Sequence, residues 1–227
     1  MQIERSTHAN KRKQTMPMWK TWMSCVAVAQ ALAAGSAHAQ SPSTAGSTSA
    51  DGFPSRSVTL VVPFAPGGNL DTVARTVAPA LAKALGQTVV VDNRAGAGGA
   101  IGAAAVARAE ADGHTLLVTT PNAVAVLPHM VKTPYALGAF TPVAQMAQTP
   151  LVVVVRQNAR FKDLQALLQE ARANPGRITV GHAGPGTTNH LGALALEDAA
   201  RVDVATIPYK GSAPALTDLI GGQIDVG

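Results

Sequence analysis

The strongest constraint on the fold is a regular alternation between apolar, β-branched segments and segments with helical periodicity, which begins at Arg56. The segment "SVTLVVPF" is typical of a strand, and "LDTVARTVAPALAKAL" after it places apolar residues on one face of a helix. Further strands are predicted at 87–93, 114–120, 151–156, 177–182 and 204–209, and further helices at 98–111, 161–176, 189–200 and 213–222. Strands that alternate with helices predict an α/β fold with largely parallel sheets.

The spacing of these elements predicts two α/β lobes. A Pro-rich connection near residues 121–150 follows the third strand, and we expect the chain to pass there from a first lobe, residues 53–150, to a second, residues 151–227. The second lobe should open with "LVVVVR", an unbroken apolar strand covered on both faces. The last strand segment, "QIDVG", begins where the sequence stops. We therefore expect the second lobe to be incomplete, with its C-terminal part missing, and the chain to be a fragment or a frame-shifted product.

The first 39 residues have the pattern of a secretory signal peptide. A basic stretch, "KRKQTMPMWK", precedes the apolar run "WMSCVAVAQALAA", and Ala37 and Ala39 stand in an A-x-A arrangement ahead of Gln40. The apolar run is shorter than the roughly 20 residues of a membrane span, although an N-terminal anchor helix is the alternative interpretation. Residues 1–39 thus predict export to the periplasm, and the Ser/Thr/Gly-rich residues 40–52 predict a flexible linker.

Charge and cysteine content exclude several classes of protein. The sequence has 18 Lys and Arg against 13 Asp and Glu, but the first 39 residues hold five of the basic residues and one of the acidic ones. The remainder therefore carries a net charge of +1, without the basic stripe that nucleic-acid binding requires. The only Cys and both Trp also lie in the leader, so the exported chain has neither a disulfide nor thiol chemistry.

Ligands of parallel α/β proteins bind beyond the carboxyl ends of the strands, and the turns expected there are rich in Gly, Pro, Thr and Asn. These turns are "PFAPGGNLD", "NRAGAGGAIG", "TTPNA", "GHAGPGTTNH" and "YKGSAP". The glycines from Gly96 to Gly102 miss the dinucleotide spacing, because Ile101 stands where the third glycine belongs, and the sequence has no P-loop lysine. A nucleotide cofactor is therefore not expected.

Catalytic and metal-binding patterns are weak. The sequence has no G-x-S-x-G elbow and no H-E-x-x-H, and Thr187 with His190 is a poor nucleophile–base pair. His182 and His190 flank a turn, but their spacing fits no common zinc site, and a hydrogen-bonding role is the alternative. Asp71 has two interpretations, a general base or, more simply, a first-turn acid favoured by the helix dipole. We expect no enzyme activity, no metal and no cofactor.

Anion capture by the backbone is the remaining interpretation. Gly67 and Gly68 leave their amides uncovered, the helix after them directs its positive end at the turn, and Pro63 and Pro66 stiffen the loop. The segment "GPGTTNH" offers a second such turn, with two threonine hydroxyls. Two opposed turns of this kind suit a small carboxylate that is bound and not transformed. The alternative is that these Gly-Pro turns simply connect strands to helices.

Together with these turns, the segments "VVVDNRAGAGGAIGAAAVARAEADGHTLLV", "LQEARANPGRITVGHAGPGTTNHL" and "IPYKGSAPALTDLIGGQIDV" resemble the Bug family, the extracytoplasmic solute receptors of tripartite tricarboxylate transporters. The resemblance runs from about Phe53 to Gly227. It implies a type II periplasmic binding protein fold with two α/β lobes, a cleft between them and a small carboxylate ligand. It also implies that members continue past Gly227, so we expect the isolated chain to express poorly or to bind weakly.

The resemblance implies ligand-binding positions on four loops. They are Phe64, Ala65, Pro66, Gly67, Gly68, Asn69 and Asp71 on the first-lobe loop, Thr120 and Asn122 after the third strand, Gly184, Gly186, Thr187, Thr188 and His190 on the second-lobe loop, and Tyr209, Lys210, Gly211 and Ser212 on the next turn. For Lys210 two roles are open, a counter-charge to the ligand and a solvated turn residue.

These observations favour a monomeric periplasmic receptor that captures a small organic carboxylate by closure of two lobes. It would present this ligand to the membrane permease components of a tripartite tricarboxylate transporter. Nucleic acid is not an expected partner. Two alternatives stay open, a secreted hydrolase-like enzyme built on the same turns and a receptor whose loaded form docks on a signalling sensor. The sequence does not name the ligand, but no arginine is evident in the cleft loops, which mildly favours a ligand with one dominant acidic end.

Overall fold

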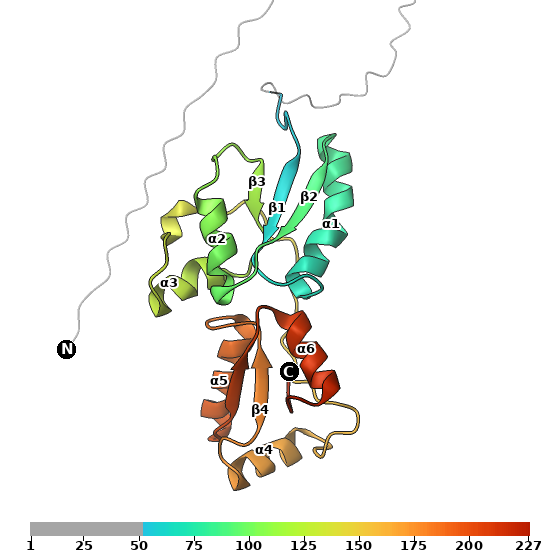
Figure 1. The fold of residues 1–227 in the computed structure, drawn as a ribbon, viewed down its shortest axis with the longest axis vertical. Coiled ribbons are helices and arrows are strands. Elements are labelled where there is room, and N and C mark those ends of the chain that lie inside the picture. The colour runs from blue at the N-terminus through green and yellow to red at the C-terminus, as the bar shows by residue number, and fades with distance from the viewer. Residues whose placement is uncertain (1–51) are drawn as a thin grey trace, which may run out of the picture. The chain divides into compact units, whose positions relative to one another are not determined.

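Two parallel sheets organise residues 52–227, the part of the chain that the computed structural model describes (Figure 1). The predicted signal peptide, residues 1–39, and the predicted linker up to residue 51 lie outside the described residues. By its internal contacts, Thr48–Gly227 forms one unit.

The first sheet is built around β1 (Val58–Val62), which pairs in parallel with β2 (Val89–Asn93) on one side and with β3 (Thr115–Leu117) on the other. The central strand is almost completely buried, in agreement with its β-branched and largely apolar sequence. Since all three strands are parallel, their carboxyl ends lie at the same edge of the sheet, where the predicted ligand loops begin.

The helices of the first sheet are α1 (Asn69–Leu85) and α2 (Ala100–Ala107), and the short 3-10 turn η1 (Ala97–Gly99) leads into the second of them. Figure 1 shows α1 beside β2 and α2 on the side of β3. Small residues on α1 allow the helix to approach the central strand closely. The resulting core consists of Val58, Leu60, Val62, Ala74, Ala78 and Val118.

The second sheet consists of the parallel strands β4 (Thr179–His182) and β5 (Ala205–Pro208). Three helices alternate with these strands along the chain, α4 (Leu164–Ala173), α5 (Thr188–Ala200) and α6 (Ser212–Gly221). This order repeats the strand–loop–helix pattern that the sequence predicts. One hydrophobic core cluster of this part consists of Ala159, Phe161, Leu167, Ala171, Ile178 and Val226.

The connection between the two sheets contains only short helical pieces within the described residues. They are the π-helical turn η2 (Asn122–Val126), α3 (Leu127–Met130) and the 3-10 turn η3 (Leu137–Ala139). The strands before residue 150 belong to the first sheet and those after it to the second. The lobe boundary at 150/151 stays a prediction.

The predicted strand at 151–156 is wrong. This segment makes only a single bridge, between Val155 and Val226, and two backbone hydrogen bonds between Val154 and Gly227. Leu151, Val152 and Val153 are 55%, 62% and 51% exposed. The expectation that both faces of this segment are covered is therefore wrong. An apolar, β-branched run forms a strand only where neighbouring backbone groups complete its ladder, and here the ladder ends after one bridge.

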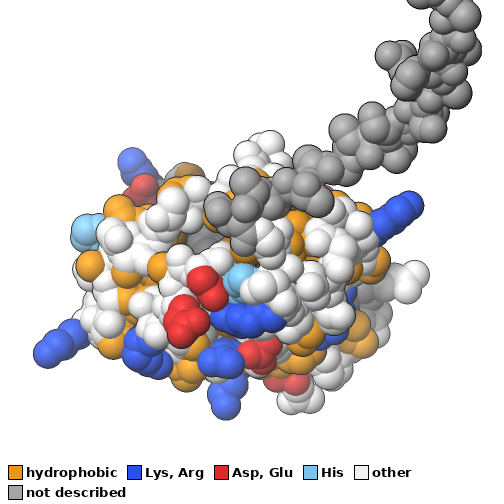
Figure 2. All heavy atoms as spheres, turned by 90° about the horizontal axis from the view of Figure 1, so that it is seen from above, with side chains coloured by type: hydrophobic (Ala, Val, Ile, Leu, Met, Phe, Trp, Pro, Cys, Tyr) orange, Lys and Arg blue, Asp and Glu red, His pale blue; other side chains and the backbone are white. Residues whose placement is uncertain are grey.

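The surface carries charges of both signs. Figure 2 shows a face on which Lys and Arg side chains alternate with Asp and Glu side chains, without a continuous basic area. Arg56, for example, pairs with Asp112 at 2.8 Å and with Glu110 at 3.6 Å. Within residues 52–227, none of the helices combines the length and the apolar character needed to cross a membrane.

Candidate functional site

Three helices begin at one shared cavity of about 280 Å³. The lining includes Asn69 and Leu70 from the first turn of α1, Thr188 and Asn189 from the first turn of α5, and Ser212, the first residue of α6. The loops before these helices follow β1, β4 and β5, so the cavity lies at the carboxyl ends of strands from both sheets, as expected for an α/β binding site.

These three helix starts lack side-chain caps. The residues that precede them, Gly68, Thr187 and Gly211, make no capping hydrogen bond, and the Thr187 hydroxyl instead donates to the Gly184 carbonyl oxygen at 2.6 Å. Helix α4, which does not line this cavity, is capped by Asp163 Oδ1, which accepts from the amide of Ala166 at 2.7 Å. Because first-turn amides have no partner within their own helix, the three uncapped starts direct N–H donors and positive dipole ends toward one space. This arrangement suits an anion.

Asp71, in the first turn of α1, fixes the loop before that helix. The residue is only 4% exposed, and its carboxylate accepts hydrogen bonds from the amide of Gly67 at 2.9 Å, from Arg75 Nε at 3.0 Å and from Asn93 Nδ2 at 2.9 Å. Burial by itself raises the pKa of Asp71, but the hydrogen bonds from Arg75, Gly67 and Asn93 together lower it below the ordinary aspartate value. The Gly67 amide, expected to be open to a ligand, is therefore used inside the loop, and these contacts favour the structural one of the two roles predicted for Asp71.

Asn122 joins the loop after β3 to the turn before α2. Its side chain is buried, donates from Nδ2 to the Gly98 carbonyl oxygen at 3.2 Å, and accepts a hydrogen bond from the Thr120 hydroxyl. Both side chains line the 280 Å³ cavity. Asn122 thus shapes the wall of the cavity and holds η1 in place.

Two histidines stack at the base of the loop between β4 and α5. The rings of His182 and His190 lie 4.3 Å apart, the amide of Gly186 donates to His190 Nδ1 at 3.1 Å, and the amide of Gly184 lies 3.2 Å from His182 Nδ1. Burial has the largest effect and lowers the pKa of His182, whereas the Gly184 carbonyl oxygen, 2.9 Å from His182 Nδ1, raises it, and the neighbouring His190 lowers it further. The pair therefore supports the loop conformation through hydrogen bonds.

No hydrogen bond joins Thr187 to His190 within the described residues, because each side chain is bound to the backbone of its own loop. Residues 52–227 contain no group of three or more His, Cys, Asp or Glu side chains that could hold a metal ion. At the start of α5 the loop offers hydrogen-bond donors to a ligand.

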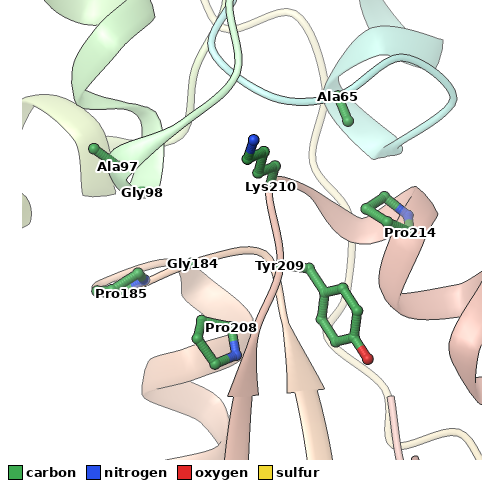
Figure 3. Close-up of a pocket in the computed structure, with 9 residues that line it drawn as sticks. All are labelled: Ala65, Ala97, Gly98, Gly184, Pro185, Pro208, Tyr209, Lys210 and Pro214. Atoms are coloured by element: carbon green, nitrogen blue, oxygen red, sulfur yellow. The ribbon is translucent and has the colours of Figure 1, made fainter. Parts of the chain in front are cut away.

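A second cavity, of about 550 Å³, adjoins the same loops (Figure 3). It is lined by Ala65, Ala97, Gly98, Gly184, Pro185, Pro208, Tyr209, Lys210 and Pro214. The Tyr209 hydroxyl donates to Asp218 Oδ2 at 2.7 Å and points away from Lys210 in Figure 3. Burial and the Asp218 carboxylate raise the pKa of Tyr209 to about 12.

The predicted ligand-binding residues divide between the two cavities. The 280 Å³ cavity is lined by Phe64, Gly68, Asn69, Asp71, Thr120, Asn122, Thr187, Thr188 and Ser212. The 550 Å³ cavity is lined by Ala65, Gly184, Tyr209 and Lys210. Neither is lined by Pro66, Gly67, Gly186, His190 or Gly211, which belong to the same loops and set their shape. That these residues bind a ligand stays a prediction.

Sequence reasoning missed part of the cavity wall. Leu70, Ala147, Thr149, Pro150, Leu151, Ala183 and Asn189 also line the 280 Å³ cavity. Thr149 accepts a hydrogen bond from Asn69 Nδ2 at 3.2 Å, which brings the connection between the sheets against the start of α1. The only signal in the sequence was that Thr149-Pro150 ends a Pro-rich connection, and such a dipeptide does not reveal which helix it contacts.

Comparison with known proteins places the chain in a family. Residues 73–227 match the family model described as "Tripartite tricarboxylate transporter family receptor". The chain is 43% identical over 194 residues to the UPF0065 protein of the tcbD-tcbE intergenic region of Pseudomonas sp. (strain P51), covering 85% of this chain and 58% of the relative. It is 41% identical over 179 residues to protein BugT of Bordetella pertussis, covering 78% of this chain and 55% of the relative.

A solved structure supports the same relationship. MatC from Rhodopseudomonas palustris with bound malate superposes with a TM-score of 0.71 at 39% identity, over 77% of this chain and 60% of MatC. The chain thus spans less than two thirds of the length of these relatives. The likeness confirms the predicted α/β fold of the periplasmic binding protein type, and the matches together show that this chain belongs to the tripartite tricarboxylate transporter receptor family, as its resemblance to Bug proteins predicts.

Proposed function

We propose that this chain is a non-catalytic receptor that binds a small organic carboxylate in the 280 Å³ cavity. The observation that carries the proposal is the convergence of three uncapped helix starts, those of α1, α5 and α6, on that cavity. A carboxylate held there accepts hydrogen bonds from backbone amides whose position is fixed before the ligand arrives, so little ordering entropy is lost on binding.

The lining of the cavity favours a carboxylate over a larger or more highly charged anion. Among the described lining residues the one charged side chain is Asp71, whose carboxylate already accepts three sets of hydrogen bonds and is compensated by Arg75. A nucleotide or polyphosphate would meet no lysine or arginine in this lining, whereas one carboxylate matches the partial positive charges of the helix starts. The volume also suits a metabolite of a few carbon atoms.

The relatives support the wider role. The matching family is named as a transporter receptor, and MatC holds malate. By this analogy, the chain acts in the periplasm as a monomer, closes its two lobes on the carboxylate and delivers it to the membrane permease components of a tripartite tricarboxylate transporter. The engagement of Thr187 and His190 with the loop backbone favours this role over the secreted hydrolase.

Isothermal titration calorimetry with malate and other small carboxylates tests the proposal, and an aspartate placed at a helix start makes the test specific. In Ser212→Asp the new carboxylate competes with the ligand for the start of α6, so we expect malate affinity to fall at least tenfold while the helix dipole keeps the fold stable. Leu164→Asp is the matched control, because it places the same group at the first residue of α4, outside the cavity. Equal affinities of the two variants would contradict the proposed site.

A further inference from the structure

The loop between β4 and α5 is closed by its two histidines. His182 is the last residue of β4 and His190 lies in the first turn of α5, and their rings stack at 4.3 Å with an interplanar angle of 25°. The residues between them that line the 280 Å³ cavity are Ala183, Thr187, Thr188 and Asn189. Neither ring lines this cavity, so the pair acts on a ligand there only through the loop whose two ends it joins.

Each ring holds the loop through a contact that depends on its protonation. His190 Nδ1 accepts a hydrogen bond from the amide of Gly186 at 3.1 Å, so this nitrogen carries a lone pair and no proton. The amide of Gly184 lies 3.2 Å from His182 Nδ1. Because both nitrogens of an imidazolium are donors, protonation of Nδ1 in either ring replaces an acceptor by a donor that faces a backbone N–H group.

The loop has little room to find other partners. A Cβ atom on Gly186 would lie 3.0 Å from Met130 Sδ in α3, and one on Gly184 would lie 3.0 Å from the Cα atom of Gly98 in η1. Both glycines also have a positive φ, of +71° and +127°. A change in the hydrogen bonds of the two rings is therefore expected to move the whole segment up to the start of α5.

No carboxylate compensates a charge on the pair. Among the described residues, no ion pair includes His182 or His190. The titratable groups of the elements that pack against the loop are His129 and Lys132 in and after α3, Tyr209 and Lys210 after β5, Asp218 in α6, and Glu197 and Asp198 in α5. Asp218 accepts from the Tyr209 hydroxyl at 2.7 Å, and Glu197 accepts from the amide of Val204 at 2.9 Å. Two imidazolium rings in the stack would also repel each other.

We propose that His182 and His190 are positioning residues, whose uncharged stack holds the start of α5 toward the 280 Å³ cavity, so that uptake of a proton by the pair displaces this loop and weakens carboxylate binding. This inference rests on the proposed function and adds a dependence on pH to it. The receptor would then hold its ligand tightly in neutral solution and release it more readily in mildly acidic solution.

Calorimetry with malate at pH 7.5 and 5.5 tests the inference on the wild type, His182→Phe, His190→Asn, His190→Leu and His129→Gln, with circular dichroism to show that each chain is folded. Comparing chains at the same pH cancels the titration of malate itself, and Asp71, with its lowered pKa, stays ionised at both values. His182→Phe keeps an uncharged ring in the stack, and His190→Asn places an amide oxygen where Nδ1 accepts from Gly186.

We expect the wild type to lose at least about threefold more malate affinity between the two pH values than His182→Phe and His190→Asn do. His129→Gln, exposed in α3, should lose as much as the wild type. At pH 7.5, His190→Asn should bind malate more tightly than His190→Leu, which has a similar size but no acceptor. Since linkage is reciprocal, malate should in turn lower the pKa of His182, which a nuclear magnetic resonance titration of its ring measures.

The possible failures are distinct. If malate and other small carboxylates do not bind the folded wild type at pH 7.5, the proposed function fails and the inference fails with it. If malate binds but the wild type and the two uncharged variants lose affinity in parallel, the proposed function stands and the inference is overturned. Tighter binding by the wild type than by these variants at pH 5.5 alone, or a rise of the His182 pKa on malate binding, would mean that the charged rings attract the ligand, which also overturns it.

Discussion

The amide of Ala65 donates a 2.9 Å hydrogen bond to the carbonyl oxygen of Lys210, and this bond joins the loop after β1 to the loop after β5. Gly211 makes the approach possible. With φ at +149°, it adopts a conformation that favours glycine, and a Cβ atom there would lie 3.0 Å from the Ala65 nitrogen. The contact between loops of the two sheets therefore depends on a residue that lines neither cavity.

Replacing Gly211 should weaken this contact. In Gly211→Ala the new methyl group meets the backbone of Ala65 and the strained φ adds to the cost, so we expect the free energy of unfolding to fall by about 1–3 kcal/mol. Gly221→Ala is the control. Gly221 is the last residue of α6, the helix that begins directly after Gly211, and nothing lies within 4 Å of its Cβ position. Urea denaturation measures both, and equal midpoints for the two variants would show that the loop contact does not limit stability.

Asp71→Asn should loosen the loop before α1. The neutral amide loses the charge-assisted bond from Arg75 and offers one acceptor in place of two, so we expect a loss of about 1–3 kcal/mol in unfolding free energy together with weaker carboxylate binding. Asp163→Asn is the matched control, since asparagine caps a helix about as well as aspartate.

The pH dependence of the same variant gives a second test. The folded-state pKa of Asp71 is lowered, so its stabilising contribution is fully present above the ordinary carboxyl value of 3.8 and is lost as the pH falls below that value. Acid unfolding of the wild type between pH 5 and pH 2 should thus be steeper than that of Asp71→Asn. Parallel acid transitions would contradict the role of this carboxylate.

His182 should make stability depend on pH in a higher range. Its pKa in the folded state is lowered, chiefly by burial, so below the ordinary value of 6.5 the unfolded chain takes up a proton that the folded chain does not. The free energy of unfolding should therefore fall as the pH drops below about 6.5. Urea unfolding at pH 7.5 and 5.5 should show a larger loss in the wild type than in His182→Gln, whereas His129→Gln, exposed in α3, should behave as the wild type does.

The apolar segment 151–153 gives a test of burial. Val152 is 62% exposed and Ile178 is 1% exposed, although both stand in segments that the sequence predicts as strands. We expect Val152→Ala to change the unfolding free energy by less than about 0.5 kcal/mol and Ile178→Ala to lower it by about 2–5 kcal/mol. A large loss from Val152→Ala in urea denaturation would mean that this segment is covered in solution.

The elements that sequence reasoning predicted correctly are those whose signal is local. Apolar runs and helical periodicity located β1, α1, α4 and α5. The strand predicted at 151–156 was wrong because strand formation depends on pairing with residues far along the chain.

The contacts of the candidate site were also missed where they join residues that are distant in the sequence. The glycine-rich turns were visible in the sequence, but the use of the Gly67 amide by Asp71 follows from one rotamer, and the contact of Thr149 with Asn69 joins residues 80 positions apart. Whether a helix start is capped by its own side chain also depends on geometry, as the Thr187 hydroxyl shows by binding the Gly184 carbonyl oxygen.

The proposed site is tested most directly by a titration of the ¹⁵N-labelled chain with malate, followed by amide chemical shifts. We expect saturable shifts of the first-turn amides of α1, α5 and α6, at Asn69, Leu70, Thr188, Asn189 and Ser212, while the first-turn amides of α4, capped by Asp163, stay unchanged. Shifts confined to other parts of the chain, or shifts at α4 equal to those at the three uncapped starts, would contradict it.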